Sequence, residues 1–218
     1  MGDGCVRVLM LRDGEFDKRV GDDGVEVWVT QMGGYMNMNT AFIDRGSGIV
    51  AIVDPFDSER WVEELAQEGL SPTHLLYTHT HRDHVAGYSS MMSLVPGVEV
   101  WGHDEARVPS LLGHVVFKKV DFTETWSNDP DTTVEWSAGS ISLGVTHSPG
   151  HAPGHVTLHG HGVYHAGDLL FTNGMGRVDL PGSDPRAQWM SIRNAKGILM
   201  ELPRDWRLIP GHRYDWID

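Results

Sequence analysis

The sequence predicts a mixed α/β fold, arranged as an αβ/βα sandwich in one domain that spans residues 1–218. Strand-like runs of apolar and β-branched residues fill most of the chain, and helical patterns interrupt them in both halves. Helices at both ends of a mostly β chain favour sheets that pack together with helices outside them. With 218 residues and 40% hydrophobic content, the chain is long enough to bury such a core.

The first part of the chain predicts three strands and then a helix. The strands are separated by glycine-rich turns and cover residues 25–30, 39–43 and 49–53. A helix is expected over residues 59–67, because apolar side chains recur there on one helical face. Asp57 or Ser58 would cap its N-terminus, and Gly69 would end it.

The remainder of the chain repeats this alternation. Further strands are expected over residues 73–77, 98–101, 132–136, 141–146, 156–158, 163–165 and 206–210. Helices are expected over residues 86–94 and 185–200, the second capped by Ser183 or Asp184. Residues 103–130 show no sustained period, and their structure is not predicted.

The string THTHRDH at residues 78–84 is the densest group of metal-ligand side chains. It places three imidazoles and a carboxylate directly after an apolar strand that ends at Tyr77. Imidazole and carboxylate are ligands of zinc, iron and manganese. A metal site explains this density better than solvated loop histidines do, because histidine and aspartate residues also follow later predicted strands.

Three later stretches supply those ligands. The string HSPGHAPGH at residues 147–155 must be a rigid loop, because its prolines and glycines exclude a helix. Asp168 follows the apolar run at residues 162–166, and His212 follows the run at residues 206–210. Four strand ends thus each present groups that bind metals.

These stretches resemble the metallo-β-lactamase superfamily, and most of all its glyoxalase II and persulfide dioxygenase-like branch. The matches occur in the family's order and are THTHRDH (78–84), SPGHAPGH (148–155), GDLLF (167–171), GRVDLPGSD (176–184) and PGH (210–212). With residues 39–43 and 52–55 upstream, they cover nearly the whole chain. The resemblance implies the four-layer αβ/βα sandwich of the metallo-β-lactamase fold.

The resemblance also implies two metal sites that share one carboxylate. The first would be formed by His79, His81 and His151, the second by Asp83, His84 and His212, with Asp168 bridging them. Two divalent cations are expected, with zinc first and iron or manganese as alternatives. Such a pair, about 3.5–4 Å apart, activates a shared hydroxide. Asp83 would accept or relay a proton, and it is also expected to cap a helix that begins near residue 85.

Three further residues are expected to contact substrate. Arg177 lies within GRVDLPGSD, Tyr35 lies in a candidate rim at residues 32–36, and His155 follows His151 on the same loop. His155 could instead support a metal ligand from behind. In the family, the region equivalent to residues 103–130 often covers the cleft, so its aromatic side chains either contact substrate or pack the loop onto the body. These aromatic residues are Phe117, Phe122 and Trp126.

Two reactions are compatible with the resemblance. The first expectation is a glyoxalase II-like hydrolase of a small ester or thioester, and the alternative is a persulfide dioxygenase that uses one iron at His79, His151 and Asp168. Asp168 argues against a β-lactamase, and Phe171 against a lactonase, because those members carry other residues there. The chain ends six residues after His212, which predicts that the helical domain of full-length glyoxalase II is absent and weakens glutathione thioesters as substrates. A metal-stabilised binding module ranks below both reactions.

The composition limits the partners. The net charge of −13 opposes a nucleic-acid partner, because phosphate binding relies on clustered lysine and arginine. We expect no membrane partner, because no apolar run approaches the length of a span. The charged N-terminus has no signal-peptide core and predicts a cytoplasmic protein. A small-molecule substrate is expected, and a homodimer is left open.

Overall fold

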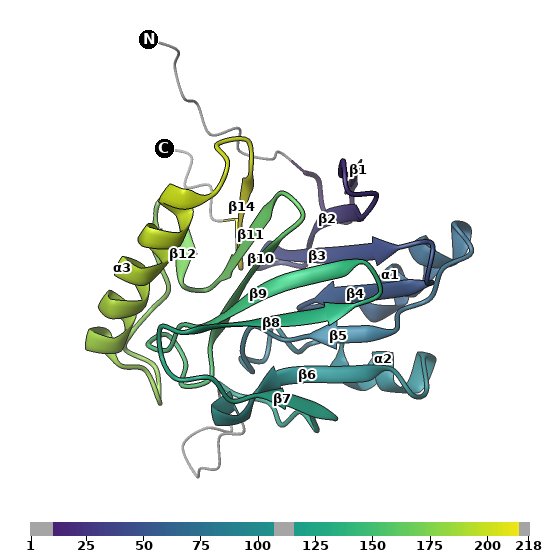
Figure 1. Cartoon of the computed structure of the whole chain (residues 1–218). Helices are drawn as coiled ribbons and strands as arrows, with labels where there is room; N and C mark the ends of the chain where they lie inside the picture. The colour runs from purple at the N-terminus through teal and green to yellow at the C-terminus, as the bar shows by residue number, and fades with distance from the viewer. Residues whose placement is uncertain (1–10, 107–115, 214–218) are drawn as a thin grey trace.

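A computed structural model describes residues 11–106 and 116–213 of the chain (Figure 1). Part of the segment 103–130 lies outside these ranges. Two large sheets dominate the described residues, and a two-stranded hairpin stands beside the second sheet. None of the described helices is both long and apolar enough to cross a membrane.

The first sheet has seven strands in chain order. They are β1 (Phe16–Val20), β2 (Glu26–Met32), β3 (Asn37–Asp44), β4 (Ile49–Val53), β5 (His74–Leu76), β6 (Glu99–His103) and β7 (Glu124–Trp126). Neighbours are antiparallel from β1 to β4 and parallel from β4 to β7. The parallel half therefore directs the ends of β4, β5 and β6 toward one edge of the sheet.

The second sheet has five strands. Their spatial order is β14 (Arg207–Pro210), β11 (Val163–Gly167), β10 (Val156–Gly160), β9 (Ile141–His147) and β8 (Thr133–Ala138). Only β11 and β14 pair in parallel, so their carboxyl ends also meet at one edge. The hairpin consists of β12 (Leu170–Phe171) and β13 (Gly174–Met175).

Helices cover the outer face of each sheet. Helices α1 (Ser58–Gln67) and α2 (Tyr88–Leu94) pack on the first sheet, where Trp61, Leu65 and Met91 join the side chains of β2 to β6. Helix α3 (Pro185–Glu201) packs on the second sheet through Ala195 (Figure 1). The order of layers is thus helices, sheet, sheet, helix, as the sequence predicts.

Alternation along the strands explains this layering. In β4, Ala51 and Val53 point into the core between the sheets, whereas Val50 and Ile52 point toward α1 and α2. Successive strand residues face opposite sides, so a strand covered on both faces is apolar throughout. The core between the sheets is completed by the second sheet, which contributes Leu143, Val145, Val156, Leu158 and Val163 among others.

The helix caps agree with the sequence prediction at two places and differ at a third. Asp57 accepts a hydrogen bond from the backbone of Arg60, and Asp184 accepts from Arg186 and Ala187. The predicted cap at Asp83 is wrong, because α2 begins at Tyr88 after Gly87. A Cβ at Gly87 would lie 2.4 Å from the Pro55 carbonyl oxygen, so the turn before α2 is pressed against the loop after β4.

Candidate metal centre

The loops at the ends of the strands of both sheets are tied together by backbone hydrogen bonds. Val156 N donates to Thr78 O at 2.8 Å, which joins the start of β10 to the loop after β5. Gly211 N donates to Gly167 O at 2.7 Å, which joins the ends of β14 and β11. These bonds bring residues 78–84, 151, 168 and 212 to one place.

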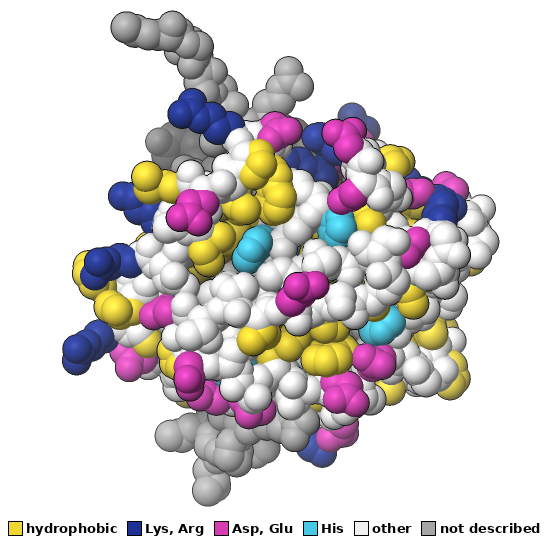
Figure 2. Space-filling view, in the orientation of Figure 1, with side chains coloured by type: hydrophobic (Ala, Val, Ile, Leu, Met, Phe, Trp, Pro, Cys, Tyr) yellow, Lys and Arg dark blue, Asp and Glu magenta, His cyan; other side chains and the backbone are white. Residues whose placement is uncertain are grey.

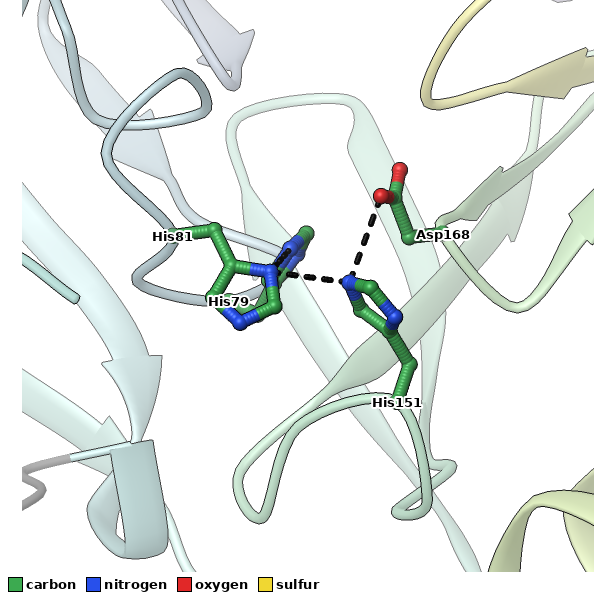
Figure 3. Close-up of side chains that lie close together, drawn as sticks. All are labelled: His79, His81, His151 and Asp168. Carbon is green, nitrogen blue, oxygen red and sulfur yellow. Dashed lines mark hydrogen bonds and ion pairs between the residues drawn. The ribbon is translucent and has the colours of Figure 1, made fainter. Parts of the chain in front are cut away.

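The first group of donor atoms consists of three imidazoles and a carboxylate (Figure 3). The Nδ1 atom of His81 lies 3.0 Å from His79 Nε2 and 2.8 Å from His151 Nε2. His151 Nε2 lies 3.3 Å from Asp168 Oδ2. A ring nitrogen offers either one proton or one lone pair, so His81 Nδ1 can form only one of these two hydrogen bonds. A shared cation fits the donor set.

The second group lies on the other side of Asp168. His84 Nε2 lies 3.2 Å from His212 Nε2 and 3.1 Å from Asp168 Oδ1. His212 Nε2 lies 3.1 Å from Asp83 Oδ2. Asp168 therefore presents Oδ2 to the first group and Oδ1 to the second, which is the arrangement expected of a carboxylate shared by two cations.

Oxygen atoms behind three of the histidines determine which ring nitrogen faces the centre. His151 Nδ1 donates to Arg177 O at 2.8 Å, and His212 Nδ1 donates to Tyr35 O at 2.8 Å. His84 Nδ1 lies 2.8 Å from Asp54 Oδ2. A carbonyl or carboxylate oxygen only accepts, so each Nδ1 carries the proton and each Nε2 is left to bind a cation.

Arg177 and Tyr35, which the sequence assigns to substrate binding, both line the cleft beside the centre. Their backbone carbonyls hold His151 and His212, a role that no side-chain pattern predicts. The Arg177 guanidinium forms a two-pronged ion pair with Asp179, with N–O distances of 2.8 and 2.9 Å.

The prediction that His155 contacts substrate needs correction. His155 is fully buried and does not line the cleft. Its Nε2 accepts a hydrogen bond of 3.0 Å from the backbone N–H of Asp168. The alternative role, support of a ligand from behind, matches this position.

Asp54 and Asn37 support the site, although the sequence assigned them no role. Asp54 is buried and accepts from the Thr78 backbone and hydroxyl as well as facing His84. It follows an apolar strand, as Asp168 does, and that signal could have identified it. Asn37 donates to Asp83 Oδ2 at 3.0 Å. No sequence pattern distinguishes Asn37 from other strand asparagines.

Burial and neighbouring charges set the protonation of the donors. Burial, with adjacent histidines, holds the pKa of His79 well below its usual value and lowers the pKa of His81 to about 3. Burial opposes ionisation of Asp168, but His84, His151 and His212 lower its pKa. Burial likewise opposes the charge on His212, yet Asp168 and Asp83 raise its pKa to about 9. His79 and His81 are thus neutral, whereas the carboxylates favour the protonated forms of His84 and His212, whose protons would be released if a divalent cation bound.

The cleft over the donor atoms has a volume of about 1040 Å³. Its floor contains donor residues from both groups, namely His81, Asp83, His151, Asp168 and His212. The walls come from the loops after β2 and β4, from the β12–β13 hairpin and from the residues that follow it. A small molecule in the cleft would therefore lie directly on the candidate metal-ligand residues.

The aromatic residues of the segment 103–130 mostly pack the body. Trp126 lies in β7 and belongs to the core between the sheets, and Phe122 packs beside Gly102 with the α1 and α2 layer. Phe117 is buried with its ring centroid 4.6 Å from that of His81. None of the three lines the cleft.

Residues 34–212 match the family model described as "Metallo-beta-lactamase superfamily". Hydroxyacylglutathione hydrolase of Aeromonas hydrophila is 32% identical over 178 residues, which make up 82% of this chain and 62% of that protein. Hydroxyacylglutathione hydrolase GloC of Haemophilus influenzae is 31% identical over 173 residues, which make up 74% of this chain and 79% of that protein. The chain thus spans about three fifths of the Aeromonas relative.

Two solved structures have a similar fold. The BLEG-1 B3 metallo-beta-lactamase has a TM-score of 0.71 and 25% identity, covering 85% of this chain and 91% of that one. The protein TTHA1623, solved in a di-iron-bound form, has a TM-score of 0.62 and 27% identity, covering 84% of this chain and 91% of that one. The layered fold thus has counterparts in known proteins.

Proposed function

Because the chain belongs to the metallo-beta-lactamase superfamily, we propose that it is a metal-dependent hydrolase of a small ester or thioester. Relatives named hydroxyacylglutathione hydrolase support this reaction class. The negative charge of the chain supports a small-molecule substrate rather than a nucleic acid.

The observation that carries the proposal is the position of Asp168 between two groups of donor atoms. The proposed ligands of one cation are His79, His81, His151 and Asp168, and those of the other are Asp83, His84, His212 and Asp168. Zinc is the first candidate, and iron and manganese are alternatives. Because both groups are complete, two cations are favoured over one.

When bound, the cations would polarise the substrate carbonyl and lower the pKa of the attacking water molecule. The chain holds the ligands in fixed orientations through Asp54, Arg177 O and Tyr35 O. Asp83 is the carboxylate that accepts or relays the proton of the attacking water, since its side chain is 26% exposed, whereas that of Asp168 is 9% exposed.

Metal analysis combined with an assay tests the proposal. Protein purified without added metal should contain close to two zinc, iron or manganese ions per chain and should hydrolyse hydroxyacyl thioesters. Removal of the ions with a chelator should abolish hydrolysis, and returning them should restore it. A single iron per chain, with oxygen consumed on addition of a persulfide and no thioester hydrolysed, would overturn the assignment.

A further inference from the structure

We propose that the cleft selects thioesters with an apolar acyl group of several carbons and does not require glutathione as the thiol. This inference rests on the proposed hydrolase function and specifies its substrate class. It follows from which side chains stand at each end of the metal centre.

Aromatic side chains stand at the end of the cleft nearest His212. The Phe171 ring lies 6.0 Å from the His212 ring, and Tyr35 holds His212 through its carbonyl while its own side chain is 65% exposed. Phe56 completes this wall. A Cβ at Gly33 would lie 2.4 Å from the Phe56 ring, so close packing of the β2–β3 turn fixes the ring.

Aliphatic side chains stand at the opposite end, near His81 and His151. Val116 lines the cleft there, and its carbonyl accepts from the Arg82 N–H, so it runs beside the loop that carries His81. Leu180 lines the cleft from the loop that turns back at Ser183, whose hydroxyl donates to His151 O at 2.8 Å. A substrate carbonyl group above the donor atoms would therefore have an apolar wall on each side. Either orientation of the substrate would place the acyl group beside an apolar wall.

The charges of the cleft do not favour glutathione, whose two carboxylates outweigh its one ammonium group. Arg82 and Arg177 are the basic side chains that line the cleft among the described residues. Arg177 is already paired with Asp179 through two contacts, so a substrate carboxylate would compete with Asp179 for the same guanidinium. The overall charge of −13 also opposes an anionic ligand.

The size of the cleft permits a long acyl group. Its volume of about 1040 Å³ lies at the upper end of the range for small-molecule pockets, roughly 300–1,000 Å³. Burial of each added methylene in an apolar wall raises affinity by up to about 4-fold. The value of kcat/KM should therefore increase with each methylene added to the acyl group.

The test varies acyl group and thiol independently. Acetyl, butyryl, hexanoyl and octanoyl thioesters are prepared from N-acetylcysteamine, which is uncharged, and from glutathione. With the metal-loaded full chain, kcat/KM should rise by about 2-fold to 4-fold per methylene until the cleft is filled. For a given acyl group, the glutathione thioester should be no better than the N-acetylcysteamine thioester.

A pair of methionine variants shows where the acyl group binds. Met175 lines the cleft and is 51% exposed, whereas Met200 is 76% exposed at the end of α3 and does not line the cleft. Met175→Gln should lower kcat/KM for the octanoyl thioester more than for the acetyl thioester. Met200→Gln should leave the ratio of the two unchanged, and metal content should be equal in both variants.

The outcomes separate this inference from the proposed function. Hydrolysis of the glutathione thioesters at least about 100-fold better than their counterparts, with no dependence on acyl length, would overturn the inference and leave the hydrolase proposal standing. Failure to hydrolyse any of the eight thioesters would overturn the inference, and failure to hydrolyse hydroxyacyl thioesters as well would overturn the hydrolase proposal. An equal loss for octanoyl and acetyl substrates in Met175→Gln would contradict contact between the acyl group and the apolar lining of the cleft at Met175.

Discussion

The imidazole of His155 accepts a hydrogen bond from the backbone amide of Asp168, 3.0 Å away, and lies behind the carboxylate that joins the two donor groups. Its Nε2 must therefore be unprotonated, and the proton resides on Nδ1. Nδ1 has no hydrogen-bond partner among the described residues. His155 thus positions a proposed ligand without touching the cleft.

The first prediction compares Asp168 with His155. Asp168→Ala should lose most bound metal and reduce turnover by several orders of magnitude, because both donor groups lose a member. His155→Ala should keep its metal and lose at most about 10–100-fold in activity. Elemental analysis and kinetics on the two variants provide the check. Equal loss of metal in both would show that the ligand set is wrong.

The second prediction concerns Asp54. The carboxylate accepts two hydrogen bonds from Thr78 and faces His84 Nδ1. An asparagine amide in its place would direct its NH₂ group toward one of these donors, so that hydrogen bond would be lost. Asp54→Asn should weaken binding of the second cation by about 10–100-fold. Asparagine tolerates the positive φ of 49° at this position, so the backbone should be unaffected.

Asp44→Asn is the matched control for Asp54→Asn, since Asp44 is also mostly buried and accepts several hydrogen bonds, but far in the fold from the donor atoms. Titration with zinc against a competing chelator compares the metal affinities of the two variants. Metal affinity that falls in both variants alike would mean that general destabilisation, and not the contact with His84, accounts for the effect.

The third prediction uses two glycines of the hairpin region. A Cβ at Gly176 would lie 2.0 Å from Asp168 O and 2.8 Å from His151 Nδ1, whereas a Cβ at Gly174 would meet nothing within 4 Å. Gly176→Ala should therefore displace ligands and reduce metal content to one ion per chain or fewer. Gly174→Ala should bind metal as the parent chain does. A fully loaded Gly176→Ala protein would contradict the packing described for this loop.

The fourth prediction concerns acid stability. Hydrogen bonds from the Ser140 backbone and the Ser47 hydroxyl lower the pKa of Asp44 below the model-peptide value of 3.8. A carboxyl with a lowered folded-state pKa stabilises the fold above its unfolded pKa, and this contribution is lost as the pH falls through the folded pKa. Asp44 connects the end of β3 to the β8–β9 turn, so it links the two sheets.

Thermal unfolding of chelator-treated protein checks this linkage. At about pH 7, Asp44→Asn should unfold several degrees below the parent chain, and the difference should narrow below about pH 4, where the Asp44 carboxyl becomes protonated in the unfolded chain. Removal of metal from both proteins prevents pH-dependent loss of metal from affecting the comparison. A difference that stays constant down to about pH 3 would show that the carboxylate charge is not involved.

The fifth prediction concerns nucleic acid. On the face shown in Figure 2, lysine and arginine side chains are scattered among acidic ones and do not gather into a patch. With the net charge of −13, binding to DNA or RNA at about 0.1 M salt should be no tighter than roughly 10⁻⁴ M. Fluorescence titration measures it, and tight binding that weakens steeply with salt would refute the expectation.

The regular elements could be predicted where burial leaves a pattern in the sequence. Strand β4 is apolar throughout because both of its faces are covered, and helix α1 begins at the predicted cap. Strand β1 could not be predicted, because its sequence FDKRV is half-buried at best and has no apolar alternation. Strand β7 is held in place by pairing with β6, a contact between distant residues that no local pattern records.

The residues of the candidate site could likewise be predicted only in part from the sequence. Its ligand residues could be proposed from motifs because imidazoles and carboxylates are rare in such density. The atoms that orient these ligand residues could not be predicted, because Arg177 and Tyr35 act through backbone carbonyls, which every residue carries. Which ring nitrogen faces the centre depends on these tertiary contacts and not on the motif.

The two carbonyl contacts have an evolutionary consequence. His151 and His212 are held by main-chain oxygens of the same cleft walls whose side chains would meet the substrate. Substitution at position 35 or 177 changes the side chain and leaves the oxygen in place. Substitutions at these positions can therefore change the substrate specificity while the contacts that hold the two histidines are kept. The two walls are thus favourable starting positions for directed evolution.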